Sequence, residues 1–108
     1  MNGPTVASSR AIATRYFNDL NSKNKDDAVT LICAAGKSQF QKRITEPNSD
    51  FDYTWSNVVY VQAGAVGNDT TALGYTATVS DGSRSQNLQL ILYFVNENGA
   101  KLCGQKTT

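Results

Sequence analysis

The sequence predicts an α+β fold in which N-terminal helices cover one face of a four-stranded antiparallel sheet. In the first half, apolar residues recur every three or four positions, as on one face of a helix. In the second half they alternate with polar residues or form short runs, and turn dipeptides separate these runs. The chain has 108 residues, which is enough for one hydrophobic core and too few for two.

The first predicted helix follows Ser8 and Ser9, whose hydroxyls can cap its N-terminus. Its apolar stripe extends over about four turns and consists of Ile12, Ala13, Tyr16, Phe17 and Leu20. A polar break at 21–25 ends it. Asn24 and Asp27 then have the spacing of a capping box and predict a second helix. That helix carries one apolar stripe up to Gly36, formed by Ala28, Leu31, Ile32 and Ala35.

A third, short helix is expected over residues 37–44, where Phe40 and Ile44 lie four positions apart. Residues 45–50 surround Pro47 and predict a loop. The first strand is expected over residues 51–66, which are rich in Tyr, Trp and Val.

Turn signals divide the rest of the second half into three strands. Residues 67–69 lead into a strand over 70–80, whose buried face is Leu73, Tyr75, Ala77 and Val79. Asp81 and Gly82 form the strongest hairpin signal and return the chain into a strand over 84–96. That strand is apolar on both faces from residue 90 to 95, which predicts a central strand covered on both sides. A turn at Asn98 and Gly99 precedes a short last strand over 101–104.

The composition excludes several classes of function. Histidine is absent, so a Ser-His-Asp or Cys-His nucleophile, an imidazole base and an ordinary zinc or iron site are excluded. The net charge is +1 and the basic residues are scattered, so nucleic acid and anionic lipid are not expected partners. The sequence has no apolar run of about 18 residues, so it predicts no membrane insertion by this segment. No metal or cofactor is expected.

Three segments of the chain resemble the NTF2-like superfamily, whose domains are cone-shaped and share the cystatin-like α+β fold. The segments are residues 11–21 (AIATRYFNDLN), 27–33 (DAVTLIC) and 98–104 (NGAKLCG). Within the superfamily, the chain is most similar to small lumazine-binding-like domains that form extracytoplasmic parts of actinobacterial proteins. The resemblance implies a curved sheet that holds the helices in its concave face and can enclose an apolar pocket. It also implies that such sheets often form dimers.

Cys33 and Cys103 lie 70 residues apart, which is too far for a redox CxxC motif, and two thiols without histidine make a poor metal site. We expect a disulfide that joins the second helix to the last strand. By the loop-entropy estimate it would contribute on the order of 4 kcal/mol. The alternative is two buried free cysteines, as in a cytosolic protein.

The resemblance also suggests where a pocket and its chemistry could lie. Steroid-isomerase-like relatives place an oxyanion-donating tyrosine on the helix that here carries Tyr16, and Asp50 or Asp52 precedes the first long strand, where a general base could lie. The alternative is that Tyr16 is a core aromatic and both acids are solvated. The possible pocket-lining residues are Tyr16, Tyr53, Trp55, Tyr75 and Tyr93.

These observations favour a non-catalytic, extracytoplasmic binding or accessory domain. It would be secreted, periplasmic or at the cell surface, either on its own or as part of a membrane-anchored parent protein. Its partner would be a small apolar ligand in the cone or a protein on the sheet, including a second copy through a wet face formed by Thr76, Thr78, Gln86 and Leu88. The alternative function is a small-molecule isomerase, dehydratase or cyclase that uses Tyr16 with Asp50 or Asp52. Residues 8–104 are expected to form the single domain, after a disordered or expression-derived segment at 1–7 and before a tail at 105–108.

Overall fold

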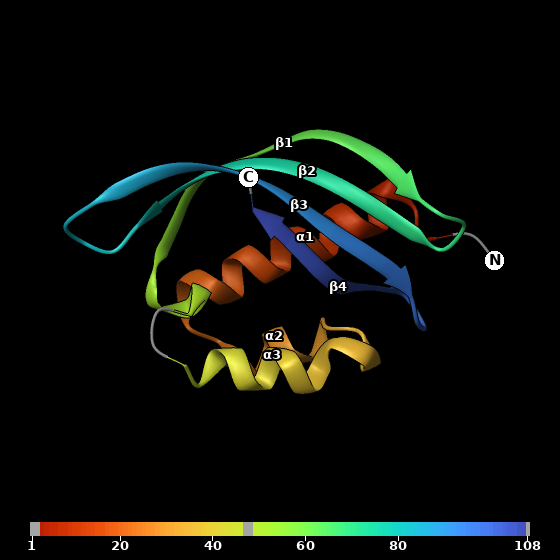
Figure 1. Ribbon diagram of the computed structural model, residues 1–108, viewed down its shortest axis with the longest axis horizontal. Coiled ribbons are helices and arrows are strands. Elements are labelled where there is room, and N and C mark those ends of the chain that lie inside the picture. Colours follow the sequence, from red (N-terminus) through yellow and green to blue (C-terminus); the bar gives the residue numbers. More distant parts are fainter. Residues whose placement is uncertain (1–2, 47–48, 108) are drawn as a thin grey trace.

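The computed structural model describes residues 3–46 and 49–107, and it confirms the predicted α+β architecture. Helices α1 (Val6–Ser22), α2 (Lys25–Thr30) and α3 (Lys37–Ile44) precede strands β1 (Thr54–Val66), β2 (Thr70–Ser80), β3 (Ser85–Asn96) and β4 (Ala100–Thr107). The strands form one antiparallel sheet in the order β1-β2-β3-β4. The sheet is curved, and α1 crosses its concave side, while α2 and α3 lie beyond α1 on the side away from β1 (Figure 1).

Helix α1 begins earlier than the sequence predicts. Thr5 is its N-cap and its hydroxyl accepts a hydrogen bond from the Ser8 backbone N–H at 3.1 Å, so Ser8 and Ser9 lie in the first turn. The helix ends where Lys23 adopts a left-handed conformation with φ of 61°. Ala13, Tyr16, Phe17 and Leu20 are buried, as their spacing predicts.

Helix α2 is shorter than predicted, and Cys33 therefore does not lie in a helix. The Asn24 side chain caps α2 by accepting from the Asp27 backbone N–H, as predicted, but the helix ends at Thr30. Ile32 instead forms a parallel bridge with Leu102 of β4. The Leu102 N–H donates to the Leu31 carbonyl at 2.7 Å, and the Cys33 N–H donates to the Leu102 carbonyl at 2.9 Å. A short 3₁₀ turn, η1 (Ala34–Gly36), then leads into α3, which has the predicted bounds.

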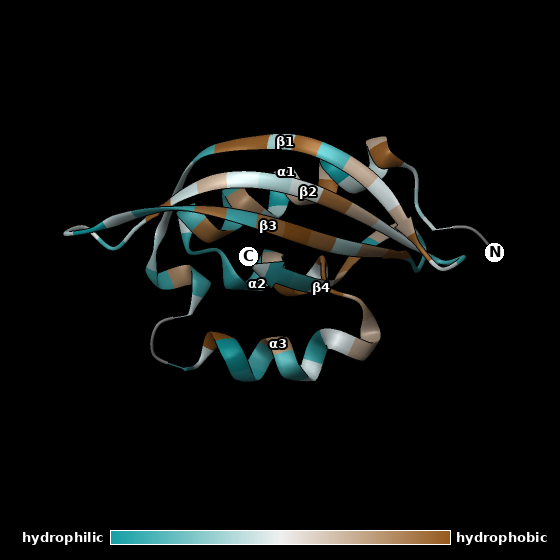
Figure 2. Ribbon diagram, turned by 45° about the horizontal axis from the view of Figure 1, so that its top comes forward, coloured by the Kyte–Doolittle hydropathy of each residue, from teal (hydrophilic) through white to brown (hydrophobic). Residues whose placement is uncertain are grey.

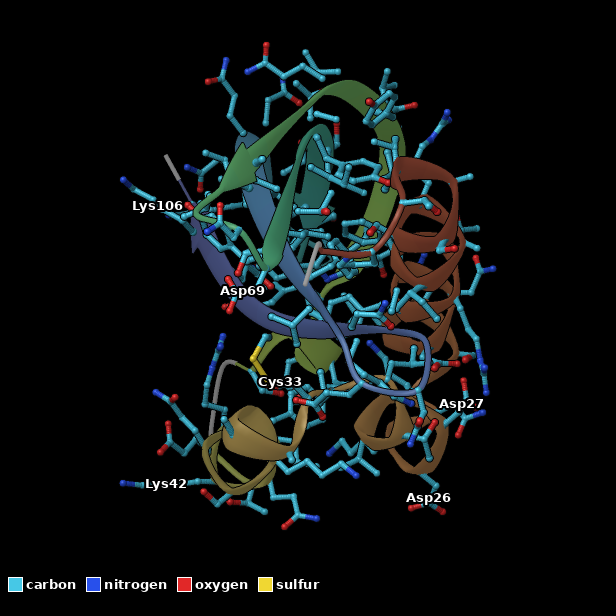
Figure 3. All side chains as sticks on the ribbon, turned by 90° about the vertical axis from the view of Figure 1, so that its right-hand side faces the viewer. Asp26, Asp27, Cys33, Lys42, Asp69 and Lys106 are labelled. Atoms are coloured by element: carbon cyan, nitrogen blue, oxygen red, sulfur yellow. A yellow bond between two sulfur atoms is a disulfide. The ribbon has the colours of Figure 1, made fainter. Side chains whose placement is uncertain are left out.

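The Cys33–Cys103 disulfide is present, as predicted, and its two Cα atoms lie 5.1 Å apart. Figure 3 shows it between β4 and the segment that precedes α3. It fixes this segment to β4 next to the hydrogen bonds of the Ile32–Leu102 bridge.

The first and last strands differ in length from the prediction. Residues 50–52 form a 3₁₀ turn, η2 (Asp50–Asp52), because the Ser49 and Asp52 side chains and backbone N–H groups cap each other; β1 therefore starts at Thr54. Strand β4 continues to Thr107 by pairing with β3, beyond the predicted end at residue 104. The predicted turns at 81–82 and 98–99 are both present, and Gly82 and Gly99 have φ of 98° and 112°.

The core lies between α1 and the concave face of the sheet. The buried face of β2 includes the predicted Leu73, Tyr75 and Ala77, whereas Val79 is only partly buried. On β3, Leu90, Leu92 and Phe94 are buried, but the alternate residues Ile91, Tyr93 and Val95 are half-exposed. Strand β3 is thus central, yet it is covered on one face, because every described helix lies on the concave side (Figures 1 and 2).

The sheet register also corrects the predicted composition of the outer face. Leu88 pairs with Ala77 and Gln86 pairs with Val79, so both residues belong to the concave side. The outer, convex face of β2 and β3 instead includes Thr76 and Thr78 with their partners Gln89 and Asn87. Among the described residues, no helix has the length and apolarity to cross a membrane.

Candidate functional site

The space between α1 and the concave face of the sheet is filled with side chains. The Phe17 ring contacts those of Trp55 and Tyr75, with centroids 5.7 and 5.6 Å apart. Tyr16 packs against Phe17 and Phe40. Tyr16, Trp55 and Tyr75 are at most 6% exposed. Tyr16 and Tyr75 are therefore part of the hydrophobic core, so the space that could have formed a deep pocket is occupied.

A cavity of about 470 Å³ lies at one end of the concave side, which we call the mouth of the cone, between η2 and the β2–β3 hairpin. Two predicted pocket residues, Tyr53 and Trp55, line it at the start of β1. Its volume lies within the usual range for small-molecule sites. The other lining residues come from η2, the β2–β3 hairpin and the end of β4, and they are Asp50, Val79, Asp81, Arg84, Ser85, Gln86, Leu88, Gln105 and Thr107.

Asp50, one of the two acids that line this cavity, contacts side chains of other elements. Its carboxylate lies 3.6 Å from the Arg43 guanidinium of α3, and its side chain is 22% exposed. Burial raises the pKa of Asp50, while the charge of Arg43 and a hydrogen bond with Gln105 oppose the rise. The Trp55 indole N–H donates to the Asp50 backbone carbonyl at 3.0 Å. These contacts fix both the backbone and the carboxylate of Asp50 in the cavity wall.

The second candidate acid, Asp52, does not line the cavity. Its carboxylate accepts a hydrogen bond from the Ser49 backbone N–H at 3.0 Å, and the residue is exposed. Asp81 does line the cavity, but its carboxylate accepts three hydrogen bonds within its own turn, from Ser83 and Arg84. These bonds lower the pKa of Asp81 and keep it ionised.

Tyr16 and Asp50 approach each other at a narrow crevice that Arg43 also lines. Burial raises the pKa of the Tyr16 hydroxyl far above its usual value, and the negative charge of Asp50 adds to the rise. Tyr16 also borders a cavity of about 200 Å³ between α3 and β4, together with Arg43 and Gln105. The structure thus brings one predicted acid near the predicted tyrosine, although Tyr16 is not among the residues that line the larger cavity.

Tyr93 lies elsewhere. It follows the outward alternation of β3 and pairs with Gly104 of β4, where a side chain at position 104 would meet the Tyr93 ring. It is therefore on the convex face and does not line the cavity at the mouth.

Sequence reasoning did not identify the polar partners of Asp50. Arg43 lies in the last turn of α3, and Gln105 lies in the stretch expected to be a tail. Neither residue belongs to a local motif. Gln105 is more than 50 residues from Asp50, so no sequence pattern indicates that the two side chains meet.

The described residues contain no group of three or more metal-ligating acids or cysteines. No protein-family model, curated protein or solved structure matches this chain.

Proposed function

We propose that the chain is a non-catalytic NTF2-like domain of an oxidising, extracytoplasmic compartment, and that it binds a small, largely apolar ligand in the cavity at the mouth of the cone. The cavity carries this proposal. It combines apolar and aromatic walls from Leu88, Val79 and Tyr53 with a few fixed polar groups, an arrangement typical of ligand sites.

The Cys33–Cys103 disulfide supports the compartment, because structural disulfides persist mainly in oxidising surroundings. The position of the acids supports binding without catalysis. Asp50 lines the cavity, but its charge is matched by Arg43, whereas proton abstraction requires a carboxylate that is free to take a proton from a bound substrate's reacting carbon.

Trp55 is the only tryptophan and lines the cavity, so its fluorescence reports on occupancy. The experiment titrates the oxidised protein with 1-anilinonaphthalene-8-sulfonate, an apolar probe with one anionic group, and follows energy transfer from Trp55. We expect saturable binding at one site. Leu88→Gln places an amide in the cavity wall and should weaken binding about tenfold, roughly the effect of losing one well-buried apolar contact.

Val59→Gln is the matched control, because Val59 is 55% exposed on the convex face. It should leave probe binding unchanged, and both variants should melt cooperatively. Absence of saturable transfer in the native protein, or equal weakening by both variants, would contradict the proposed site.

A second function, isomerisation by Tyr16 and Asp50, is favoured by one observation, the raised pKa of Asp50 beside the buried Tyr16. Its test uses a cyclic β,γ-unsaturated ketone, whose conjugated product absorbs in the near ultraviolet. Turnover above the buffer rate that is lost in both Asp50→Asn and Tyr16→Phe would replace the binding proposal by this enzyme function. We expect no such turnover.

A further inference from the structure

The two edges of the sheet differ in whether another segment of the chain covers them. At the β4 edge, the bridge between Ile32 and Leu102 and the disulfide at Cys103 cover the strand with the segment before α3. At the other edge, β1 pairs with β2 alone in the part of the chain that the structure describes. Figure 1 shows β1 as the outermost strand of the arch. Alternate backbone N–H and C=O groups along β1 therefore face outward without a strand partner.

Strand β1 lacks the features that usually protect an exposed edge. Its 13 residues include no Lys, Arg, Asp, Glu or Pro. Bulges interrupt the register near Asn57 and Val61, but pairing with β2 is regular from Gln62 to Val66. All residues from Val61 to Val66 are exposed. The regular, uncharged end of β1 is thus available for pairing with another strand.

The exposed apolar side chains gather at the same edge. Within the described residues, the exposed large hydrophobic side chains are Val6, Val59, Val61 and Val66, at 39 to 56% exposure. Three belong to β1. Val6 begins α1 shortly after Pro4, whose carbonyl accepts a hydrogen bond from Thr71, the β2 partner of Ala65. An edge with open hydrogen-bonding groups and this concentration of valine is typical of a surface that becomes covered.

We propose that this edge binds a second copy of the chain, through antiparallel pairing of the two β1 strands about a two-fold axis near Gly64. The pairing would join two four-stranded sheets into one continuous sheet of eight. About this axis, Gln62 lies opposite Val66 of the other copy and Ala63 lies opposite its Ala65. None of these side chains is charged, so two identical strands can pair without opposing like charges.

Charge complementarity at the ends of the pairing favours a second copy over an unrelated strand. The Arg10 guanidinium lies over the Tyr60 ring, 4.2 Å from its centroid. In this register the paired stretch ends at Gln62 and Val66, so the Tyr60 end of one copy lies beside the β1–β2 turn of the other copy, which carries the exposed Asp69 (Figure 3). Each end of the dimer thereby brings the cation of one copy near the anion of the other, twice by symmetry.

The experiment measures the mass of the oxidised protein by analytical ultracentrifugation, from roughly micromolar to several hundred micromolar concentration. We expect a concentration-dependent dimer. Ala65→Lys adds a charge at the centre of the edge, and by symmetry it does so twice, so it should weaken dimerisation by about tenfold or more. Ile91→Lys is the control, because Ile91 lies on the convex face of the internal strand β3, and it should leave the dimer intact.

A charge swap tests the register independently of how well Ala65→Lys folds. Arg10→Glu and Asp69→Arg should each weaken the dimer, and the double variant should restore it. A native protein that stays monomeric over the whole range would overturn the proposal, even if it binds an extended peptide. So would a dimer that Ile91→Lys dissociates and Ala65→Lys does not, because that result assigns the interface to the sheet face.

Discussion

Asp19 gives the chain a predictable dependence of stability on pH. It lies on α1 at 6% exposure, and its Oδ2 atom is buried without a hydrogen-bond partner. Burial is the main cause that raises its pKa to about 6, and the neighbouring carboxylate of Asp27 on α2 adds to the rise. Arg15 opposes it only weakly, because its guanidinium is already bound to both carboxylate oxygens of Asp27.

The sign of the effect follows from the direction of this shift. The folded state holds the Asp19 proton more tightly than the unfolded chain, where the pKa is near 3.8. The corresponding stabilisation is therefore complete below about pH 4 and is lost as the pH rises through about 6. A shift of about two units corresponds to on the order of 3 kcal/mol of unfolding free energy.

The substitution Asp19→Asn removes the titration and keeps a group that can donate to Asp27. We expect the variant to match the native protein near pH 3.5 and to exceed its free energy of unfolding at pH 8 by about 2 to 3 kcal/mol. The assay is urea unfolding of the oxidised protein, followed by Trp55 fluorescence, at several pH values.

Glu46→Gln is the matched control, because it removes one negative charge at an exposed position. It should leave the slope of stability against pH close to that of the native protein. If Asp19→Asn retains the native slope, or is the less stable protein at pH 8, the reasoning from the buried carboxylate is refuted.

Two further perturbations test the architecture. Replacing Cys33 and Cys103 together by Ala should lower the free energy of unfolding by about 4 kcal/mol, because the disulfide closes a loop with a sequence separation of 70 residues. Urea titration with and without reductant measures this loss. If reduction leaves the unfolding midpoint of the native protein unchanged, the prediction is contradicted. Leu92→Ala should cost about 3 kcal/mol, because Leu92 is fully buried on the concave face of β3. The half-exposed neighbour Ile91 should tolerate alanine at roughly a third of that cost; equal losses in thermal unfolding would contradict the assignment of the two faces.

The sequence pattern correctly predicted the helices, strands and turns that depend on interactions between residues close together in the chain. The alternation over residues 70–80 defines one face of β2, and the Asn24 cap fixes the start of α2. The hairpin at Asp81 forms because that carboxylate accepts hydrogen bonds from its own turn. Each of these depends on residues within a few positions of one another, so the sequence alone contains the necessary information.

The candidate site was less predictable, because its parts meet only through tertiary contacts. Tyr53 and Trp55 were among the expected pocket residues, but the expected pocket lay inside the cone, where Phe17 fills the space between Trp55 and Tyr75. Aromatic residues of a strand have no local signal that distinguishes a pocket wall from core packing. The ion pair of Arg43 with Asp50 likewise joins α3 to η2 through a tertiary contact.

The shortening of α2 has the same origin as the contrast between the two sheet edges. Leu31, Ile32 and Ala35 continue the apolar spacing of α2, so pattern alone extends the helix to Gly36. A helix over residues 31–33 would direct their backbone N–H and C=O groups along its own axis. In the structure those groups pair with Leu102 instead, at the strand edge where the disulfide holds the segment. The residues lost from the helix thus cover one edge of the sheet, while the chain supplies no equivalent segment to β1 in its described part.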